Sequence, residues 1–271
     1  MTRRQAEDAL AAAGRAPDGR FPLYEAALSC ALHEDSARDA DAARRLVDEA
    51  QERLRRRLVG ERPDDALGEA LGGDLQLKGD LLTPHDPANA DLIAVCDRRR
   101  GLSIALGLIY LEAGRRAGLT LAGVDFPGHF LLRVETGEGP VALDPFSGGA
   151  VVMPSELTRR ALSAGLMPGV GDRLDALMAP AGDRQIVLRL QSLIFARAMR
   201  AGDHEGAERA ALRRGLIDPG DPCPWLDVAT AREAQGRLTG ALEALHQAKT
   251  LSGLAAGPAE WASLRVRRRL N

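Results

Sequence analysis

With 271 residues, the chain is long enough to form one large domain or two smaller ones, each with a packed core. Hydrophobic residues make up 45% and charged residues 27%, which is the composition of a folded globular protein and excludes a disordered one. The net charge of −2 gives no electrostatic reason to expect a nucleic-acid or membrane partner. Because alanine and arginine are abundant and aromatic residues make up only 3%, we expect a mostly helical protein.

Neither the cysteines nor the histidines are spaced like metal ligands. Cys30, Cys96 and Cys223 are far apart and odd in number, which also argues against a disulfide framework. The five histidines contain no paired-ligand motif, so we expect no metal and no cofactor. The N-terminal sequence lacks the apolar run of a secretion signal, and no window approaches the roughly 18 apolar residues of a membrane-spanning helix. We therefore expect a cytoplasmic protein.

Apolar residues in the N-terminal half recur at intervals of three and four, which is the spacing of one helix face. The clearest stripe runs from Ala43 to Leu58, and Gly60 and Pro63 follow it as stop signals. The last helical segment of this half is apolar nearly all round, which is typical of a helix at the centre of a fold. In chain order, the predicted helices cover residues 1–13, 22–33, 39–59 and 64–71, then a helix that starts at Asn89 or Asp91 and reaches residue 100, and finally 104–117.

Three short runs rich in leucine, valine and phenylalanine follow, and they predict β-strands. Glycine-containing turns separate them, and we expect the last two to form a hairpin. Phe126, Phe130 and Phe146 are expected to form the core beneath this hairpin, where burial of each ring contributes about 1.5 to 3 kcal/mol. Helical patterns return from residue 154 onward. The predicted strands cover residues 119–126, 130–135 and 140–146, with a shorter one at 151–152.

The C-terminal part of the chain contains a repeat. Small residues recur 34 positions apart, which is the period of tetratricopeptide repeats, because small side chains let two antiparallel helices approach closely. Two ordinary helical hairpins with coincident alanines remain the alternative. We predict a first domain over residues 1–180 and a repeat domain over 181–271. The matching residues are Gly202 with Gly236, Ala207 with Ala241, and Ala210 with Ala244.

The predicted hairpin carries a histidine and an aspartate that could interact. If Leu131 lies opposite Asp144, then His129 is diagonal to Asp144, at about 7 to 8 Å between backbone positions. Side chains can close that gap with a hydrogen bond, and a carboxylate that accepts a proton from imidazole fixes the tautomer a general base needs. The start of the preceding apolar helix is a favourable place for a nucleophile, because the positive end of the helix dipole stabilises a thiolate.

A family resemblance covers most of the chain and is specific in this region. Its motifs are the run CDRRRGLSIALGLIYLEAGRRAGLTLAGVDFPGHFLLR, then LDPF and GG. This pattern resembles the bacterial SirB family of the transglutaminase-like superfamily, whose fold is related to that of papain-type proteases. Active transglutaminase-like enzymes have a cysteine two residues after the glycine that opens the central helix. Here that glycine is Gly101 and the position is Ser103, whereas His129 and Asp144 match the histidine and aspartate of the triad.

The resemblance implies an α+β, mostly helical fold with a small antiparallel sheet, a tetratricopeptide-like tail and a partial triad. Ser103 could act as a nucleophile or only as a helix N-cap, for which serine is well suited. Cys96 is a weaker candidate nucleophile, and His129 with Asp144 could simply lock the hairpin. We favour a noncatalytic protein that binds a protein partner through its tail. The alternative is an amide-bond hydrolase or acyltransferase that uses Ser103 or Cys96, with His129 as base.

Overall fold

The computed structural model describes residues 1–167, 173–251 and 256–270, and these form two compact units. The core unit comprises Pro22–Ala31 and the described residues of Arg38–Ile186. The tail unit comprises Met1–Phe21, Leu32–Ala37 and the described residues from Val187 onward. This division differs from the expected one at residues 180 and 181, because two N-terminal segments group with the C-terminal helices.

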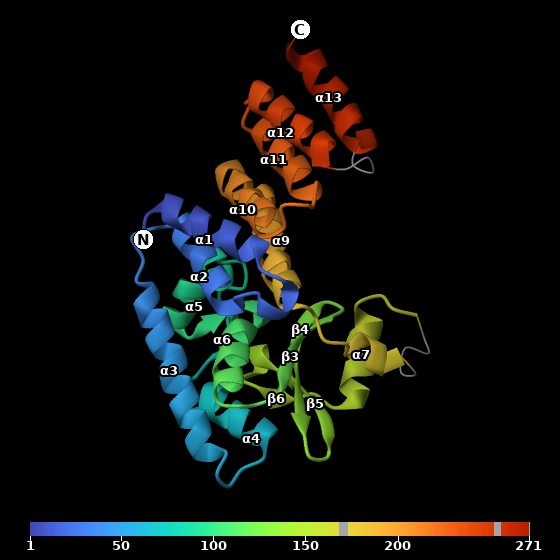
Figure 1. The fold of residues 1–271 in the computed structure, drawn as a ribbon. Helices are drawn as coiled ribbons and strands as arrows, with labels where there is room; N and C mark the ends of the chain where they lie inside the picture. Colours follow the sequence, from blue (N-terminus) through green and yellow to red (C-terminus); the bar gives the residue numbers. More distant parts are fainter. Residues whose placement is uncertain (168–172, 252–255, 271) are drawn as a thin grey trace. The chain divides into compact units, whose positions relative to one another are not determined.

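Two helices of the core unit begin at residues whose side chains cap them. Asp39 accepts hydrogen bonds from the backbone N–H groups at the start of α3, and Asp91 does the same for α5. Both helices lie within a few residues of the predicted bounds. Figure 1 shows their arrangement. The core-unit helices are α3 (Ala40–Arg57), α4 (Pro63–Leu67), α5 (Leu92–Arg98), α6 (Ser103–Arg116), α7 (Pro154–Ser163) and α8 (Leu174–Leu177), while α2 (Leu23–Glu34) and α9 (Asp183–Ala201) contribute to both units.

Helix α6 is the centre of the core unit, as its apolar sequence predicts. All residues from Ile104 to Leu111 are buried. Gly107 allows strand β4 to approach, since a Cβ atom at this position would lie 2.3 Å from the ring of Phe130. Even so, among the residues that the structure describes, no helix combines the length and the apolar character needed to cross a membrane.

Four antiparallel strands form a meander in the order β3-β4-β5-β6. Leu132 pairs with Leu143 across β4 and β5, so the register puts Leu131 opposite Asp144, as predicted. The turn between β3 and β4 is only two residues long, and its Gly128 has a φ of +73°, which favours glycine. A separate parallel pair joins β1 to β2. The strands are β1 (Lys78–Gly79), β2 (Arg100–Gly101), β3 (Leu121–Phe126), β4 (His129–Thr136), β5 (Gly139–Asp144) and β6 (Ala150–Val151).

The meander has helices on both faces. Helix α6 packs on one face through Phe130, and α7 packs on the other, as Figure 1 shows. Because side chains alternate along a strand, Leu131 points away from α6. On that face, Leu131 belongs to a hydrophobic cluster with Phe126 of β3 and with Leu157 and Ala161 of α7. The structure thus confirms a mostly helical core around a small antiparallel sheet.

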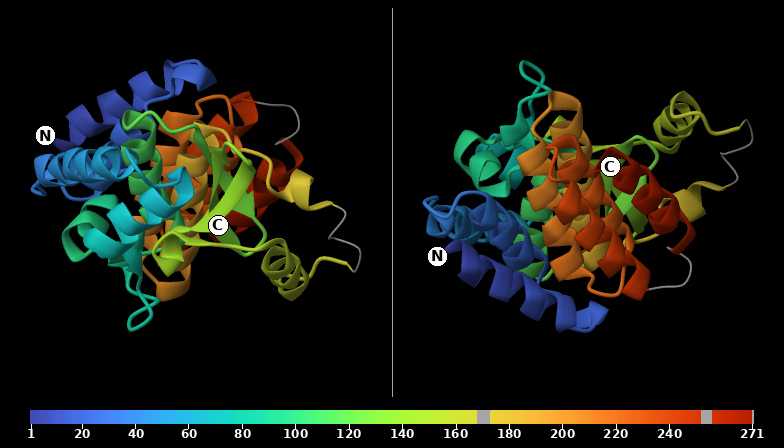
Figure 2. Two further views of the ribbon diagram at one scale, coloured as in Figure 1. Left: turned by 90° about the horizontal axis from the view of Figure 1, so that it is seen from below. Right: turned by 90° about the horizontal axis from the view of Figure 1, so that it is seen from above.

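In the described residues of the tail unit, the regular secondary structure is helical, and α10 to α13 lie side by side, as Figures 1 and 2 show in orange to red. Helix α1 belongs here because it packs closely on α10. A Cβ atom on Gly14 would lie 2.1 Å from the carbonyl oxygen of Leu216, so only glycine permits this approach. The tail-unit helices are α1 (Arg3–Arg15), α10 (His204–Ile217), α11 (Cys223–Ala234), α12 (Leu238–Leu251) and α13 (Ala256–Leu270), with parts of α2 and α9.

The 34-residue repeat in the sequence is matched by a repeat of backbone turn geometry and of buried positions. Gly202 before α10 and Gly236 before α12 have φ values of +76° and +74°. The next residue in each case donates its N–H to a carbonyl five positions back, at 2.9 Å. The four alanines of the pattern are at most 1% exposed. Two helix pairs, α9 with α10 and α11 with α12, therefore share their turn geometry and their small buried positions.

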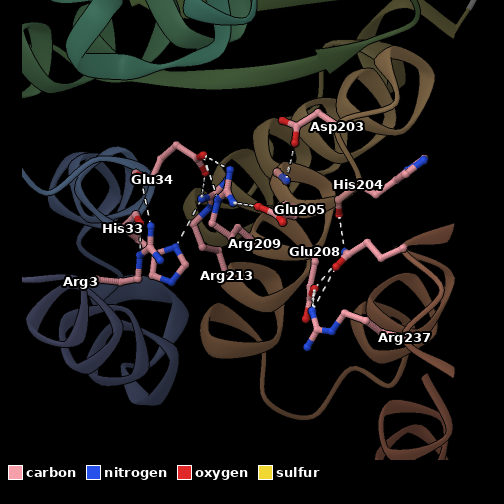
Figure 3. Close-up of polar contacts among 12 residues, drawn as sticks. Arg3, His33, Glu34, Asp203, His204, Glu205, Glu208, Arg209, Arg213 and Arg237 are labelled. Carbon is pink, nitrogen blue, oxygen red and sulfur yellow. Dashed lines mark hydrogen bonds and ion pairs between the residues drawn. The ribbon is translucent and has the colours of Figure 1, made fainter. Parts of the chain in front are cut away.

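A buried ion-pair network joins distant segments of the tail unit, as Figure 3 shows. Arg213 is only 2% exposed. Its guanidinium donates to Gln191 Oε1 at 2.6 Å and to Glu34 Oε2 at 2.8 Å, and it lies 3.4 Å from His33 Nδ1. Arg209 also donates to Glu34, at 2.6 Å. The end of α2 is thus tied to α9 and α10 by charge-assisted hydrogen bonds.

Candidate functional site

The hairpin of β4 and β5 brings the predicted histidine and aspartate into contact. His129 starts β4 directly after the tight turn, and Asp144 ends β5. Their side chains meet at 2.9 Å between Nε2 of His129 and Oδ1 of Asp144. About a quarter of the His129 side chain is exposed, at 27%, whereas Asp144 has only 2% of its side chain exposed. The carboxylate is therefore inside the protein and the imidazole faces outward from it.

Asp144 accepts hydrogen bonds from four donors. Besides His129, these are the backbone N–H of Phe146 at 2.9 Å, the Ser147 hydroxyl at 3.0 Å and Nη1 of Arg160 at 2.9 Å. Burial alone would raise the pKa of Asp144, but the hydrogen bonds and charges of His129 and Arg160 outweigh it and hold the pKa at about 2. The carboxylate is thus ionised and fully satisfied.

The pair has a defined orientation. An ionised carboxylate can only accept, so Nε2 of the imidazole carries the donated proton, and Nδ1 is the lone-pair nitrogen of the neutral ring. Arg160 shares the same carboxylate and is itself bonded to Glu156 at 2.8 Å. The guanidinium of Arg160 therefore offsets part of the negative charge of Asp144.

Ser103 lies next to this pair but is held by a different group. It is the first residue of α6, and its Oγ accepts a hydrogen bond from the backbone N–H of Phe130 at 3.4 Å. Within the described part of the chain, Ser103 makes no hydrogen bond to His129. The N-cap interpretation is wrong, because the cap residue is Leu102, which has extended backbone and no capping side chain. Ser103 is thus a helical residue tied to the strand position beside His129.

Phe146 supports the outer side of the imidazole. Its ring lies edge-to-face with His129, with centroids 5.9 Å apart and planes at 76°. Phe126 and Phe130 are fully buried as predicted, but Phe146 is half-buried, so the expectation that it belongs to the core is corrected. The absence of a side chain on Gly79 makes room for it, since a Cβ atom there would lie 2.4 Å from the Phe146 ring.

A family model described as transglutaminase-like superfamily matches residues 40–192, more than half of the chain. The match includes α6, the hairpin and all three candidate residues. The chain belongs to the transglutaminase-like superfamily. No solved structure matches it.

Bacterial proteins named UPF0162 are similar over different shares of the chain. The protein from Xylella fastidiosa is 32% identical over 238 residues, which cover 84% of this chain and 83% of the relative. One from Pseudomonas aeruginosa is 31% identical over 173 residues, covering 53% of this chain and 63% of the relative. Mouse F-box only protein 21 is similar over a shorter stretch, 37% identical over 82 residues, or 30% of this chain and 13% of that protein.

The second candidate nucleophile, the thiol of Cys96, is not part of this transglutaminase-like site. Cys96 is buried, and its Sγ lies 3.5 Å from the hydroxyl of Tyr24. Burial raises the pKa of the Cys96 thiol to about 12, so the thiolate is scarce at neutral pH. Among the described residues, no group of three or more histidine, cysteine or acidic side chains is placed to hold a metal ion.

Two members of the site are invisible to reasoning from the sequence. Ser147 and Arg160 both reach Asp144 Oδ2, yet neither belongs to a recognisable motif. The four-residue spacing between Glu156 and Arg160 predicts a surface ion pair on α7, which does form. Only the packing of α7 against the hairpin turns this arginine toward the buried carboxylate.

Proposed function

We propose that the protein is a noncatalytic transglutaminase-like protein of the SirB type that acts by binding another protein. One observation carries the proposal: the position of the thiol nucleophile is occupied by Ser103, whose Oγ is bonded to the Phe130 N–H and not to His129. A hydroxyl needs a base within hydrogen-bond reach, since a helix dipole alone does not ionise it.

The environment of Asp144 supports the same conclusion. In a working triad the carboxylate orients the imidazole and stabilises its protonated form. Here Arg160 and Ser147 share the carboxylate, and its lone pairs are fully used. The pair of His129 and Asp144 then acts mainly as a structural link between the start of β4 and the end of β5, which suits a scaffold.

The binding part of the proposal concerns the tail unit. The shared turn geometry at Gly202 and Gly236 and the buried alanines 34 residues apart support tetratricopeptide-like repeats. Such arrays present extended surfaces to protein partners. The proposed setting is the cytoplasm, in keeping with three cysteines that are all free.

An activity-based labelling experiment tests the noncatalytic assignment. The full chain is treated with a fluorophosphonate, which labels activated serines, and with iodoacetamide, beside a His129→Ala variant. We expect no labelling that depends on His129. Adducts on Ser103 in the wild type that disappear in the variant would contradict the proposal.

An amide-bond hydrolase or acyltransferase is the second candidate. The observation in its favour is that Ser103 opens α6 directly beside the intact pair of His129 and Asp144. It makes the opposite prediction for the labelling experiment, with Ser103 as the labelled residue.

Photo-crosslinking tests the role of the tail unit in the full chain. Benzoylphenylalanine is introduced at the exposed positions Thr230 or Glu243 in the tail unit, or at Glu52 or Val59 in the core unit as matched controls. We expect discrete adducts with a partner from the tail positions. Adducts that form only from the core positions would remove the tail from the proposal.

A further inference from the structure

Helix α13 has two apolar faces, of which only one is packed. Ala259 and Val266 are fully buried in the hydrophobic cluster that α13 shares with α12, and Ser263 lies beside them. On the opposite side, Trp261 is 77% exposed and Leu264 is 52% exposed. Residues three and four apart lie on one helix face, so Trp261, Leu264 and Arg268 form a single line, which we call the α13 stripe.

Repeat packing does not explain the stripe. The positions one 34-residue period earlier are Asp227 and Thr230 on α11, and both are polar. The other tryptophan, Trp225, packs against the tail-unit cluster. A largely exposed tryptophan next to an exposed leucine is costly to hydrate, and tryptophan and arginine are the residues enriched at binding hot spots.

The charges around the stripe are mostly positive. Arg267 and Arg268 are exposed, and no carboxylate among the described residues pairs with either. Arg265 is held by Glu233 at 2.6 Å. The single acidic residue on α13 is Glu260, whose carboxylate lies 3.9 Å from Lys249. A partner that covers the stripe therefore gains most if it brings carboxylates.

We propose that the α13 stripe is a docking surface for an acidic segment of another protein, which packs an apolar side chain against Trp261 and Leu264 and pairs carboxylates with Arg267 and Arg268. The inference rests on the proposed binding role of the tail unit and names the chemistry of its partner. A membrane fits less well, because an interfacial helix buries a broad apolar face and α13 uses its own against α12.

Peptide binding to the full chain tests the inference. The probe is a fluorescein-labelled amphipathic helical peptide with leucines on one face and glutamates on the other, and its counterpart has every glutamate replaced by lysine. Anisotropy is expected to report saturable binding of the acidic peptide that weakens with added salt. Trp261→Ala, and separately the pair Arg267→Glu with Arg268→Glu, should each weaken it by about tenfold or more.

Matched variants on the core unit serve as controls. Val59→Ser removes an apolar side chain that is 90% exposed, and Arg56→Glu reverses an arginine whose side chain is 75% exposed. Both should bind the acidic peptide like the wild type. In a Trp225→Phe chain the remaining tryptophan is Trp261, so its emission should also shift to shorter wavelength when the peptide binds.

Five results would overturn the inference. These are no binding of the acidic peptide at its highest soluble concentration, equal binding of the basic peptide, an affinity unchanged by Trp261→Ala, and Trp261-dependent binding to phosphatidylserine vesicles or self-association in sedimentation. Partner adducts from the Thr230 position that persist in Trp261→Ala would reject this surface alone. The absence of any adduct from the tail positions of the wild-type chain would instead reject the proposed function.

Discussion

Asp144 shows how one buried residue decides what its neighbours can do. It is ionised in the interior and bonded to four donors from four different residues, so it fixes the end of β5, the following turn and α7 together. Under the proposed noncatalytic role, these contacts serve to anchor the fold. At the residue scale, the observed hydrogen bonds of the site converge on the aspartate.

Removing this carboxylate should therefore cost stability. In Asp144→Asn, Arg160 loses one of its two carboxylate partners and His129 loses an ionised acceptor, while the side chain stays almost the same size. We expect the free energy of unfolding to fall by roughly 2 to 4 kcal/mol in urea titrations at neutral pH. The control is Glu156→Gln, which also removes a partner of Arg160 but at the surface, and it should cost less than about 1 kcal/mol. Equal losses would contradict the anchor role.

Restoring a thiol should reveal what the site retains. In Ser103→Cys the new sulfur stands at the positive start of α6, which stabilises a thiolate. The background is Cys223→Ser, because Cys223 is exposed while Cys30 and Cys96 are buried. We expect iodoacetamide to alkylate Cys at this position faster than it alkylates Cys223 in the wild type, and more slowly when His129→Ala is added. An alkylation rate that is the same with and without His129→Ala would mean that the two side chains do not cooperate.

At the scale of elements, the network at the end of α2 ties helices together by charge. His33 is 3% exposed, between Arg213 on one ring nitrogen and Glu7 on the other, with Arg3 bonded to its carbonyl. Burial lowers the pKa of His33, and the charge of Arg213 lowers it further, although Glu7 opposes both. Burial would raise the pKa of Glu34, but Arg209 and Arg213 hold it at about 2.

These shifts make the tail unit less stable in acid. Between the folded pKa of His33 and its unfolded value of about 6.5, the unfolded chain binds more protons, so stability falls as the pH falls below about 6.5. Glu34 adds a second loss of stability as the pH falls below about 4.5, because its carboxyl also binds a proton more readily in the unfolded chain. Urea unfolding followed by tryptophan emission from pH 8 to pH 5 measures the slope. His33→Gln should flatten it in that range, and an unchanged slope would assign the effect to other groups.

The elements were largely predictable because each leaves a local signal. Helix α6 was expected over residues 104–117 and runs over Ser103–Arg116, and the hairpin register followed from a turn centred on residues 137–139. The short helix α8 and the contribution of Arg160 were not predictable. Periodicity shows which face of an element is buried, but not against which other element it packs.

The whole molecule shows the same limit on a larger scale. Both units contain segments that are distant in the sequence, and the grouping of α1 with the C-terminal helices could not be anticipated. The signal for that grouping is one glycine. Gly14 lets α1 approach the end of α10, and nothing in the sequence distinguishes it from the many glycines in turns.

Filling the space at Gly14 should consequently loosen the tail unit. In Gly14→Ala the new methyl group would meet the Leu216 carbonyl oxygen at 2.1 Å, so α1 must shift. The steric cost of roughly 1 to 3 kcal/mol exceeds the gain in helix propensity of at most about 1 kcal/mol. Both tryptophans belong to the tail unit, so their emission in urea reports its unfolding. Gly19→Ala is the matched control, because a Cβ atom there meets nothing within 4 Å. If both variants unfold at the wild-type urea concentration, α1 is not an integral part of the tail unit.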